Sequence, residues 1–227
     1  MALYQKYRPT DFSELIGNRE ELDAFRAALA KPAEDRPTAY LLTGPRGIGK
    51  TTAARIAARE LGATVMSLRE VNSADNRGID TAREIIDEMR LASLSGDARC
   101  YIIDEIHQCS RDWMNAMLKP LEDTPPRTYF FLCTTDPQKL IAPLCSRCHP
   151  VNLKPLPTKL LYRLLFKVAT KEGIKCSKDT LEEVAEAAQG SPRDALVLLE
   201  KIAGLYGPET VPTDAAVSKL LAQGAEE

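Results

Sequence analysis

Eight consecutive residues near position 50 have the types and spacing needed to hold a nucleoside triphosphate. Gly44-Pro45-Arg46-Gly47-Ile48-Gly49-Lys50-Thr51 fits the pattern of a glycine, four residues and then Gly-Lys-Thr. Glycines let backbone N–H groups turn inward on phosphates, and the N-terminus of a following helix adds partial positive charge. We expect Lys50 to reach the β- and γ-phosphates and the Thr51 hydroxyl to ligate Mg²⁺. The residues expected to contact the nucleotide in this loop are Gly44, Pro45, Gly47, Ile48, Gly49, Lys50, Thr51 and Thr52.

The flanking residues provide the strand and helix that such a loop requires. The apolar run 40–43 predicts a strand, and 52–61 predicts a helix with apolar residues at three-to-four spacing. The alternative, a glycine-rich turn that binds nothing, is disfavoured by this strand–loop–helix context.

Two acidic residues form a second candidate group. Cys100–Ile103 predicts a buried strand, and Asp104 and Glu105 follow it directly. At the carboxyl edge of a parallel sheet, Asp104 would lie beside the Mg²⁺ and Glu105 would accept a proton from the water that attacks the γ-phosphate. Thr128–Cys133 predicts the next buried strand, which would bring Thr134 to the same edge, where its hydroxyl could hold that water or the γ-phosphate. The alternative for Glu105 is that it caps the following turn.

The remaining pattern predicts an α/β fold with a parallel sheet, followed by helices only. We expect an extended segment over 4–14, a helix over 18–31, a second strand over 64–68, helices over 79–91 and 112–121, and a last strand over 151–153. Ser110 and Asp136 are expected to cap helices, the latter ahead of Pro137. Three helices over 157–171, 177–189 and 191–206 complete the pattern. The domains expected are therefore 1–154, 155–206 and a tail over 207–227 with one short helix.

Composition excludes several classes of protein. The chain has 227 residues, a net charge of −2 and 44% hydrophobic residues, as in ordinary globular proteins. No apolar run is long enough to cross a bilayer, and the start lacks the apolar stretch of a secretory signal, so we expect a cytoplasmic protein. Six scattered cysteines favour reduced thiols over a disulfide framework. Cys145 and Cys148 fit a haem-attachment or half-zinc spacing, but the other features such sites need are not evident, and neither zinc nor haem is expected.

Several ordered motifs resemble the AAA+ ATPases, specifically clamp-loader ATPase subunits of the bacterial DnaX and replication factor C small-subunit type. The resemblance extends over about 4–223 and rests on 5–9, 72–79, 104–107, 134–140, 146–148 and 190–196. It implies an AAA+ nucleotide-binding domain with a helical lid, and ATP hydrolysis that depends on oligomer formation. It further implies an N-terminal segment around the adenine, a γ-phosphate sensor, an arginine that reaches into the neighbour's site in trans, and a second sensor in the lid. The residues carried over for these roles are Tyr7, Arg8, Pro9 and Ile16 for the adenine segment, Thr134 for the sensor, Arg147 in Ser-Arg-Cys for the trans arginine, and Arg193 for the lid.

The same resemblance implies the partners of the chain: sister subunits, a sliding clamp and primer–template DNA. Arg77, Arg83 and Arg90 are candidates for contact with the DNA backbone, with a solvated helix face as the alternative. Trp113, Met114 and Met117 lie where relatives touch the clamp, with core packing as the alternative. The four-cysteine zinc module of DnaX is missing, so we expect no metal except Mg²⁺, and the chain ends where the family's collar domain would begin. The rival functions are a branch-migration or fork-maintenance AAA+ ATPase and an ATP-binding interaction module with little hydrolysis.

Overall fold

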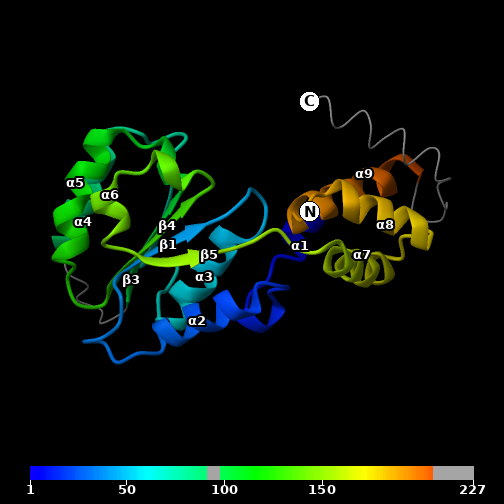
Figure 1. The fold of residues 1–227 in the computed structure, drawn as a ribbon, viewed down its shortest axis with the longest axis horizontal. Coiled ribbons are helices and arrows are strands. Elements are labelled where there is room, and N and C mark those ends of the chain that lie inside the picture. Colours follow the sequence, from blue (N-terminus) through cyan, green and yellow to red (C-terminus); the bar gives the residue numbers. More distant parts are fainter. Residues whose placement is uncertain (91–97, 207–227) are drawn as a thin grey trace. The chain divides into compact units, whose positions relative to one another are not determined.

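Five parallel strands form the sheet that carries the candidate site (Figure 1). The computed structural model describes residues 1–90 and 98–206. Within these ranges the strands are β1 (Ala39–Thr43), β2 (Leu68–Asn72), β3 (Arg99–Asp104), β4 (Thr128–Thr134) and β5 (His149–Asn152), in the spatial order β2-β3-β4-β1-β5. All four pairings between neighbours are parallel. Since β4 lies between β1 and β3, the carboxyl ends of these three strands meet at one edge of the sheet.

Alternate residues of the strands supply two apolar faces, as expected of a parallel sheet with helices on both sides. On one face, Tyr101, Ile103 and Leu132 pack with side chains from α4 (Ile79–Arg90) and α5 (Arg111–Glu122). The opposite face is covered by α2 (Arg19–Leu29) and α3 (Lys50–Glu60), whose inward residues are buried. The ring of Phe25 on α2 meets Tyr40 and Phe131 there at centroid distances of 5.3 and 6.3 Å.

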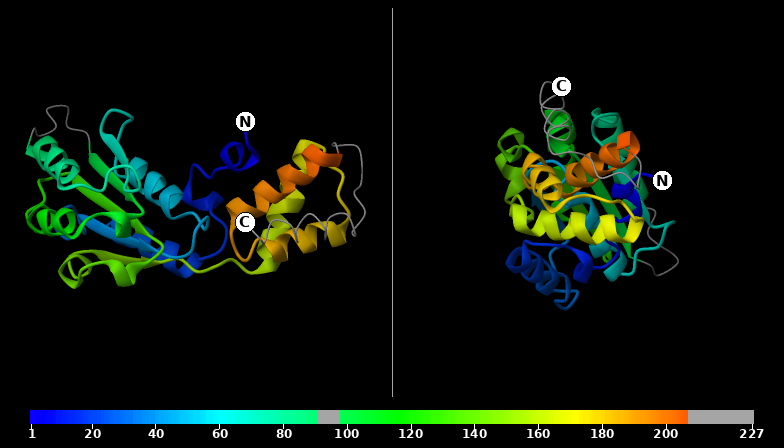
Figure 2. Two further views of the ribbon diagram at one scale, coloured as in Figure 1. Left: turned by 90° about the horizontal axis from the view of Figure 1, so that it is seen from above. Right: turned by 90° about the vertical axis from the view of Figure 1, so that its right-hand side faces the viewer.

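The chain divides into two units. The sheet unit comprises Arg19–Gly44 and Lys50–Leu153, and the helical unit comprises residues 1–18, 45–49 and the described residues from 154 onward. In the helical unit, α7 (Thr158–Glu172), α8 (Lys178–Ala187) and α9 (Pro192–Tyr206) pack pairwise around an apolar core (Figure 2). Among the described residues no helix is both long and apolar enough to cross a membrane.

The N-terminal segment differs from the extended form expected of it. It contains a helical turn, α1 (Leu3–Lys6), and a 3₁₀ turn, η1 (Phe12–Glu14). Leu3 is buried with the helices of the helical unit, and its N–H donates to the Glu200 carboxylate at 3.4 Å. This tertiary burial, which the polar local sequence does not reveal, favours the helical turn.

The second strand was also expected in the wrong place. Residues 64–68 were expected to form it, but β2 begins at Leu68, and Val65 and Met66 are more than nine-tenths exposed. β2 is an edge strand with a single buried residue, Val71, so that its sequence carries little apolar signal. Pairing with β3, rather than local hydrophobicity, determines its position.

Three short helical elements also lie in the described part of the sheet unit. η2 (Ile106–Gln108) follows β3, η3 (Pro137–Lys139) follows β4, and α6 (Ala142–Cys145) precedes β5. The expected N-cap of α5 is confirmed, because the Ser110 hydroxyl accepts the Trp113 N–H at 3.1 Å.

Candidate nucleotide-binding and catalytic site

Lys50 is the first residue of α3 and is 95% buried, since only 5% of its surface is exposed. Its ammonium donates to the Gly44 carbonyl at 2.8 Å. Burial lowers the pKa of Lys50, and the nearby carboxylates of Glu105 and Asp104 act in the opposite direction. A buried ammonium in this position is suited to a polyanionic ligand, which would stabilise its charge far better than the carbonyl does.

Thr51 and Asp104 are brought together as the sequence predicted. The Thr51 hydroxyl donates to Asp104 Oδ2 at 2.9 Å, although the two residues lie 53 positions apart. Burial raises the pKa of Asp104, and the bond from Thr51 partly offsets this effect. Hydroxyl and carboxylate oxygens are the hard ligands that Mg²⁺ prefers, usually from one or two carboxylates together with water and phosphate oxygens. The donor set therefore fits Mg²⁺, and no group of three His, Cys, Asp or Glu residues that could hold another metal occurs in the described chain.

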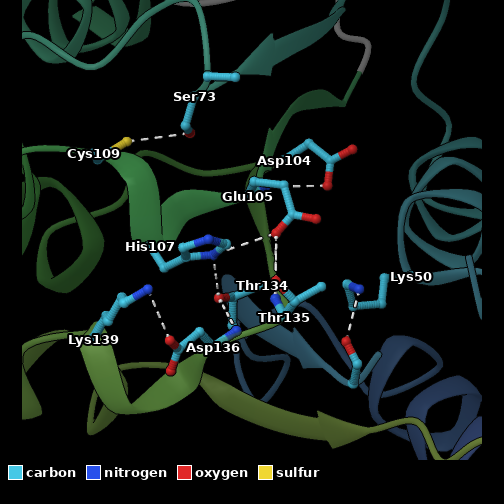
Figure 3. Close-up of polar contacts among 12 residues, drawn as sticks. Lys50, Ser73, Asp104, Glu105, His107, Cys109, Thr134, Thr135, Asp136 and Lys139 are labelled. Carbon is cyan, nitrogen blue, oxygen red and sulfur yellow. Dashed lines mark hydrogen bonds and ion pairs between the residues drawn. The ribbon is translucent and has the colours of Figure 1, made fainter. Parts of the chain in front are cut away.

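Glu105 takes a left-handed backbone conformation, with φ of 51°, directly after β3. Its Oε2 atom accepts from the Thr135 N–H at 3.3 Å and from the Thr135 hydroxyl at 3.1 Å. His107 Nδ1 lies 3.3 Å from the same oxygen (Figure 3). Glu105 is therefore held by Thr135, which follows β4, and lies beside His107 of η2, and its side chain makes no cap bond to the turn that follows.

Thr134 is fully buried at the end of β4. Its hydroxyl oxygen accepts the Asp136 N–H at 3.0 Å and lies 3.0 Å from His107 Nδ1 (Figure 3). Asp136 occupies the N-cap position of η3 ahead of Pro137, as expected, but its carboxylate pairs with Lys139 at 3.0 Å and makes no cap bond. That bond with Lys139 lowers the pKa of Asp136.

The tip of the phosphate loop belongs to the helical unit. Gly47 has a φ of +75°, and a Cβ atom added there would collide with the Ser191 hydroxyl. The Arg193 N–H donates to the Gly47 carbonyl at 3.4 Å, and the Arg193 guanidinium lies 4.9 Å from the centroid of the Tyr4 ring. The first turn of α9 and the loop tip are thus in direct contact.

The expected adenine segment also lies in the helical unit. The Tyr7 hydroxyl donates to the carboxylate of Glu172 on α7, and Lys6 pairs with the same carboxylate at 2.7 Å. Ile16 and Tyr7 pack against the apolar core of this unit, whereas Arg8 is exposed. The contact of this segment with adenine stays a prediction.

Arg147 is held at the surface by one carboxylate. Its guanidinium donates to Glu122 through Nη2 at 2.7 Å and Nε at 3.3 Å, and to the Pro143 carbonyl through Nη1 at 2.8 Å. The Arg147 side chain is 31% exposed and that of Glu122 is 63% exposed. A pair this exposed contributes only about 0–1 kcal/mol, so Arg147 can exchange Glu122 for another anionic partner at little cost.

The structure distinguishes between the expected contact surfaces. Trp113, Met114 and Met117 are each at most 2% exposed in the sheet-unit core, so they pack the core and do not form a clamp-binding surface.

The arginines expected to contact DNA lie at the surface. Arg77 and Arg83 are exposed; Arg77 donates to the Ala74 carbonyl, and Arg83 pairs with Asp80. Contact of these arginines and of Arg90 with DNA stays a prediction.

Two residues that contact the candidate base were not assigned a role from the sequence. His107 and Thr135 both bind Glu105, and they come from the turn after β3 and the end of β4. The signal that could have revealed them is position: Thr135 adjoins Thr134, and His107 lies one short turn beyond the paired acids.

Comparison with known proteins gives three matches to family models. A model for the DNA polymerase III delta subunit matches residues 63–157, and a model for the AAA ATPase domain matches residues 14–100. A model for the ATPase lid domain of the DNA polymerase III clamp loader subunit matches residues 162–203.

Whole-chain comparisons agree with these matches. The tau subunit of DNA polymerase III from Bacillus subtilis is 31% identical over 91% of this chain, and that from Escherichia coli is 34% identical over 88%. The chain spans 40% and 34% of the lengths of these two relatives. Among solved structures, the branch migration motor RuvB of Thermotoga maritima is similar with a TM-score of 0.75 over 94% of this chain and 71% of RuvB. The identity to RuvB is 22%, so this likeness shows the fold alone.

Proposed function

We propose that the chain is an AAA+ ATPase of the clamp-loader type, which binds Mg²⁺–ATP and hydrolyses it to help open a sliding clamp and place the clamp on primer–template DNA. The observation that carries this proposal is the 2.9 Å bond between Thr51 and Asp104, beside the buried ammonium of Lys50. This bond links the phosphate loop to the acidic residues at the end of β3, which are the two parts of the proposed nucleotide site. The protein would act in the cytoplasm with sister subunits.

Each residue of the site has a separate task in this mechanism. Lys50 binds the β- and γ-phosphates, and Thr51 and Asp104 hold Mg²⁺, which neutralises charge on the phosphates when it is bound. Glu105 accepts a proton from the attacking water, and Thr134 donates a hydrogen bond to the γ-phosphate. Residues 45–49 supply backbone N–H groups to the phosphates.

Two arginines would link hydrolysis to the wider assembly. Arg147 would leave Glu122 and bind the γ-phosphate in the site of a neighbouring subunit, where such an arginine contributes about 10³–10⁵ in rate. Arg193 would sense the γ-phosphate from the first turn of α9. The exposure of the Arg147–Glu122 pair supports the first role, since an easily broken pair leaves the arginine available.

The sequence relationship favours clamp loading over branch migration. The relatives that are 31–34% identical to the chain are tau subunits of DNA polymerase III, whereas identity to RuvB is 22%. The Ser146-Arg147-Cys148 tripeptide also matches the clamp-loader pattern.

The first test is steady-state ATP hydrolysis over a range of protein concentrations, with and without primed DNA and a clamp. We expect specific activity to rise with concentration, because subunits complete one another's sites. The Arg147→Ala variant should lose at least about 10³-fold in rate while it still binds ATP. Lys139→Ala, which removes an exposed cation from a different ion pair, is the matched control and should keep full activity. Activity that is near zero, independent of concentration and indifferent to Arg147 would instead identify an ATP-binding interaction module.

A further inference from the structure

His107 is the residue at which two parts of the proposed site meet. Its Nδ1 atom lies 3.0 Å from the Thr134 hydroxyl and 3.3 Å from Glu105 Oε2 (Figure 3). The side chain is 13% exposed, so the ring is largely enclosed but still reached by water. One ring nitrogen is thus shared between the proposed γ-phosphate sensor and the proposed base.

The proton of a neutral His107 ring can lie on either nitrogen, and two hydrogen-bond arrangements of the three groups differ in its position. A carboxylate only accepts hydrogen bonds, a hydroxyl has one proton to donate, and a neutral imidazole nitrogen either donates or accepts. In the first arrangement, Nδ1 carries the proton and donates to Glu105. In the second, Nδ1 accepts the proton of the Thr134 hydroxyl and presents its lone pair to the Glu105 carboxylate, which it repels.

The burial of Thr134 determines which arrangement holds in the absence of nucleotide. Its oxygen already accepts the Asp136 N–H, and its hydroxyl is fully buried. A buried donor without an acceptor is strongly unfavourable, so in the absence of another acceptor the hydroxyl donates to His107 Nδ1. A γ-phosphate oxygen, which only accepts hydrogen bonds, would accept the hydrogen bond of the Thr134 hydroxyl instead. Nδ1 could then carry a proton and donate it in a hydrogen bond to Glu105.

The contacts of Glu105 show what that proton would do. Thr135 already holds Oε2, and within the described parts of the chain Oε1 makes no hydrogen bond. If His107 Nδ1 carries a proton, it can donate a further hydrogen bond to Oε2. The carboxylate is then fixed in orientation, and Oε1 is the oxygen that receives the proton of the attacking water. A base must be oriented in this way for efficient proton transfer.

We propose that His107 is a positioning residue whose Nδ1 atom couples the Thr134 hydroxyl to the Glu105 carboxylate, so that the base is fully oriented only when Thr134 donates to a γ-phosphate. This inference rests on the proposed roles of Thr134 and Glu105. The change between arrangements moves one proton from Nε2 to Nδ1 through solvent water and leaves the ring neutral.

The direct test is long-range ¹H–¹⁵N NMR of the imidazole rings in this chain, recorded at a pH where the nitrogen shifts themselves show a neutral ring. The chain has two histidines, and the His149→Gln variant assigns the signals of His107. With Mg²⁺ and ADP we expect the proton on Nε2, and with Mg²⁺ and a non-hydrolysable ATP analogue we expect it on Nδ1. The same tautomer in both complexes would overturn the inference.

Kinetics supply an independent test. Asparagine places its amide group where histidine has Nδ1, so it can donate or accept at that position, whereas alanine can do neither. We expect His107→Ala to lower kcat about 10- to 100-fold with little change in KM for ATP, and His107→Asn to recover most of that loss. An unchanged kcat in His107→Ala, or no recovery in His107→Asn, would count against coupling through Nδ1.

The Glu105→Gln variant separates the failure of this inference from the failure of the proposed function. If Glu105→Gln does not slow hydrolysis, or if the ATP analogue does not bind, the proposed function itself fails. If Glu105→Gln abolishes turnover but His107→Ala has normal kcat and the tautomer never changes, only the coupling through His107 is wrong.

Discussion

Asp104 is a residue whose proposed role in Mg²⁺ binding is expected to lower the stability of the nucleotide-free protein. Its carboxylate is largely buried beside Thr51, and burial raises its pKa because the ionised form is poorly solvated there. A bound Mg²⁺ would stabilise this negative charge, whereas in the nucleotide-free protein the Thr51 hydroxyl, the Glu105 N–H and the Lys50 ammonium offset the effect of burial only in part. The residue proposed to hold Mg²⁺ is therefore expected to destabilise the folded protein when no nucleotide is bound.

Replacing Asp104 with asparagine should raise the Tm of the nucleotide-free protein at neutral pH and abolish stabilisation by Mg²⁺–ATP. The folded state binds the Asp104 proton more tightly than the unfolded state does, so this carboxyl contributes less stability as pH rises through its folded pKa. The advantage of Asp104→Asn should therefore be larger at about pH 7.5 than at about pH 4, where the Asp104 carboxyl is about half protonated in the unfolded protein and more fully protonated in the folded protein.

Thermal unfolding of both proteins at the two pH values checks this expectation. Asp23→Asn, at an exposed position on α2, is the control and should leave Tm nearly unchanged at either pH. An Asp104→Asn protein that is less stable than the wild type at neutral pH would show that the Thr51 bond and the Lys50 charge outweigh burial.

At the scale of elements, the phosphate loop depends on glycine for two separate reasons. Gly47 and Gly62 both have positive φ, of +75° and +87°. A Cβ atom on Gly62 would meet nothing within 4 Å, whereas one on Gly47 would collide with the Ser191 hydroxyl at the start of α9. Both positions therefore require a residue that tolerates positive φ, but only position 47 also requires a residue without a Cβ atom.

The left-handed backbone alone should cost about 1–2 kcal/mol of unfolding free energy in both Gly47→Ala and Gly62→Ala. The total loss should be larger for Gly47→Ala, because its methyl group displaces either the loop tip or the first turn of α9, and the same displacement should weaken nucleotide binding. Urea unfolding and nucleotide titration measure the two effects.

The Ser191→Ala change removes the hydroxyl that the new methyl group would meet, and it should restore part of the loss in a Gly47→Ala background. Equal losses in stability and in nucleotide affinity for the two glycine variants would refute a specific contact between Gly47 and α9.

At the scale of the whole molecule, the proposed function requires that one chain complete the site of another. The exposed pair of Arg147 and Glu122 contributes little to stability and leaves the arginine available for a neighbour. The buried Lys50, in contrast, is proposed to bind the nucleotide of its own chain. A defect in one residue should therefore be compensated by a different subunit.

Mixing two inactive variants tests this division of roles. Lys50→Ala lacks a working site but keeps Arg147, and Arg147→Ala keeps the site but lacks the arginine. We expect ATP hydrolysis to reappear when the two proteins are mixed, since Lys50→Ala subunits supply arginine to Arg147→Ala neighbours. The Lys50→Ala, Arg147→Ala double variant mixed with Arg147→Ala should stay inactive, and recovery in that control would exclude a trans role for Arg147.

The sequence by itself determined the features that depend on neighbouring residues. The phosphate loop, the buried strands over 100–103 and 128–133, the N-cap of α5 and the helices after 157 could all be predicted, because periodicity, glycine spacing and capping are local signals. The proximity of Asp104 to the phosphate loop followed from the same reasoning, since parallel strands bring their carboxyl ends to one edge, and the structure adds the bond between Thr51 and Asp104.

Only the tertiary structure decided the features that depend on distant partners. β2 owes its position to pairing with β3, and α1 owes its helical turn to burial against the helical unit. Glu105 contacts His107 and Thr135, and Arg147 binds Glu122. Each of these contacts joins residues from different elements, and no local periodic pattern in the sequence indicates them. Hydrogen bonds of this kind require distances of about 3 Å between atoms, and only the packing of the strands and helices sets those distances.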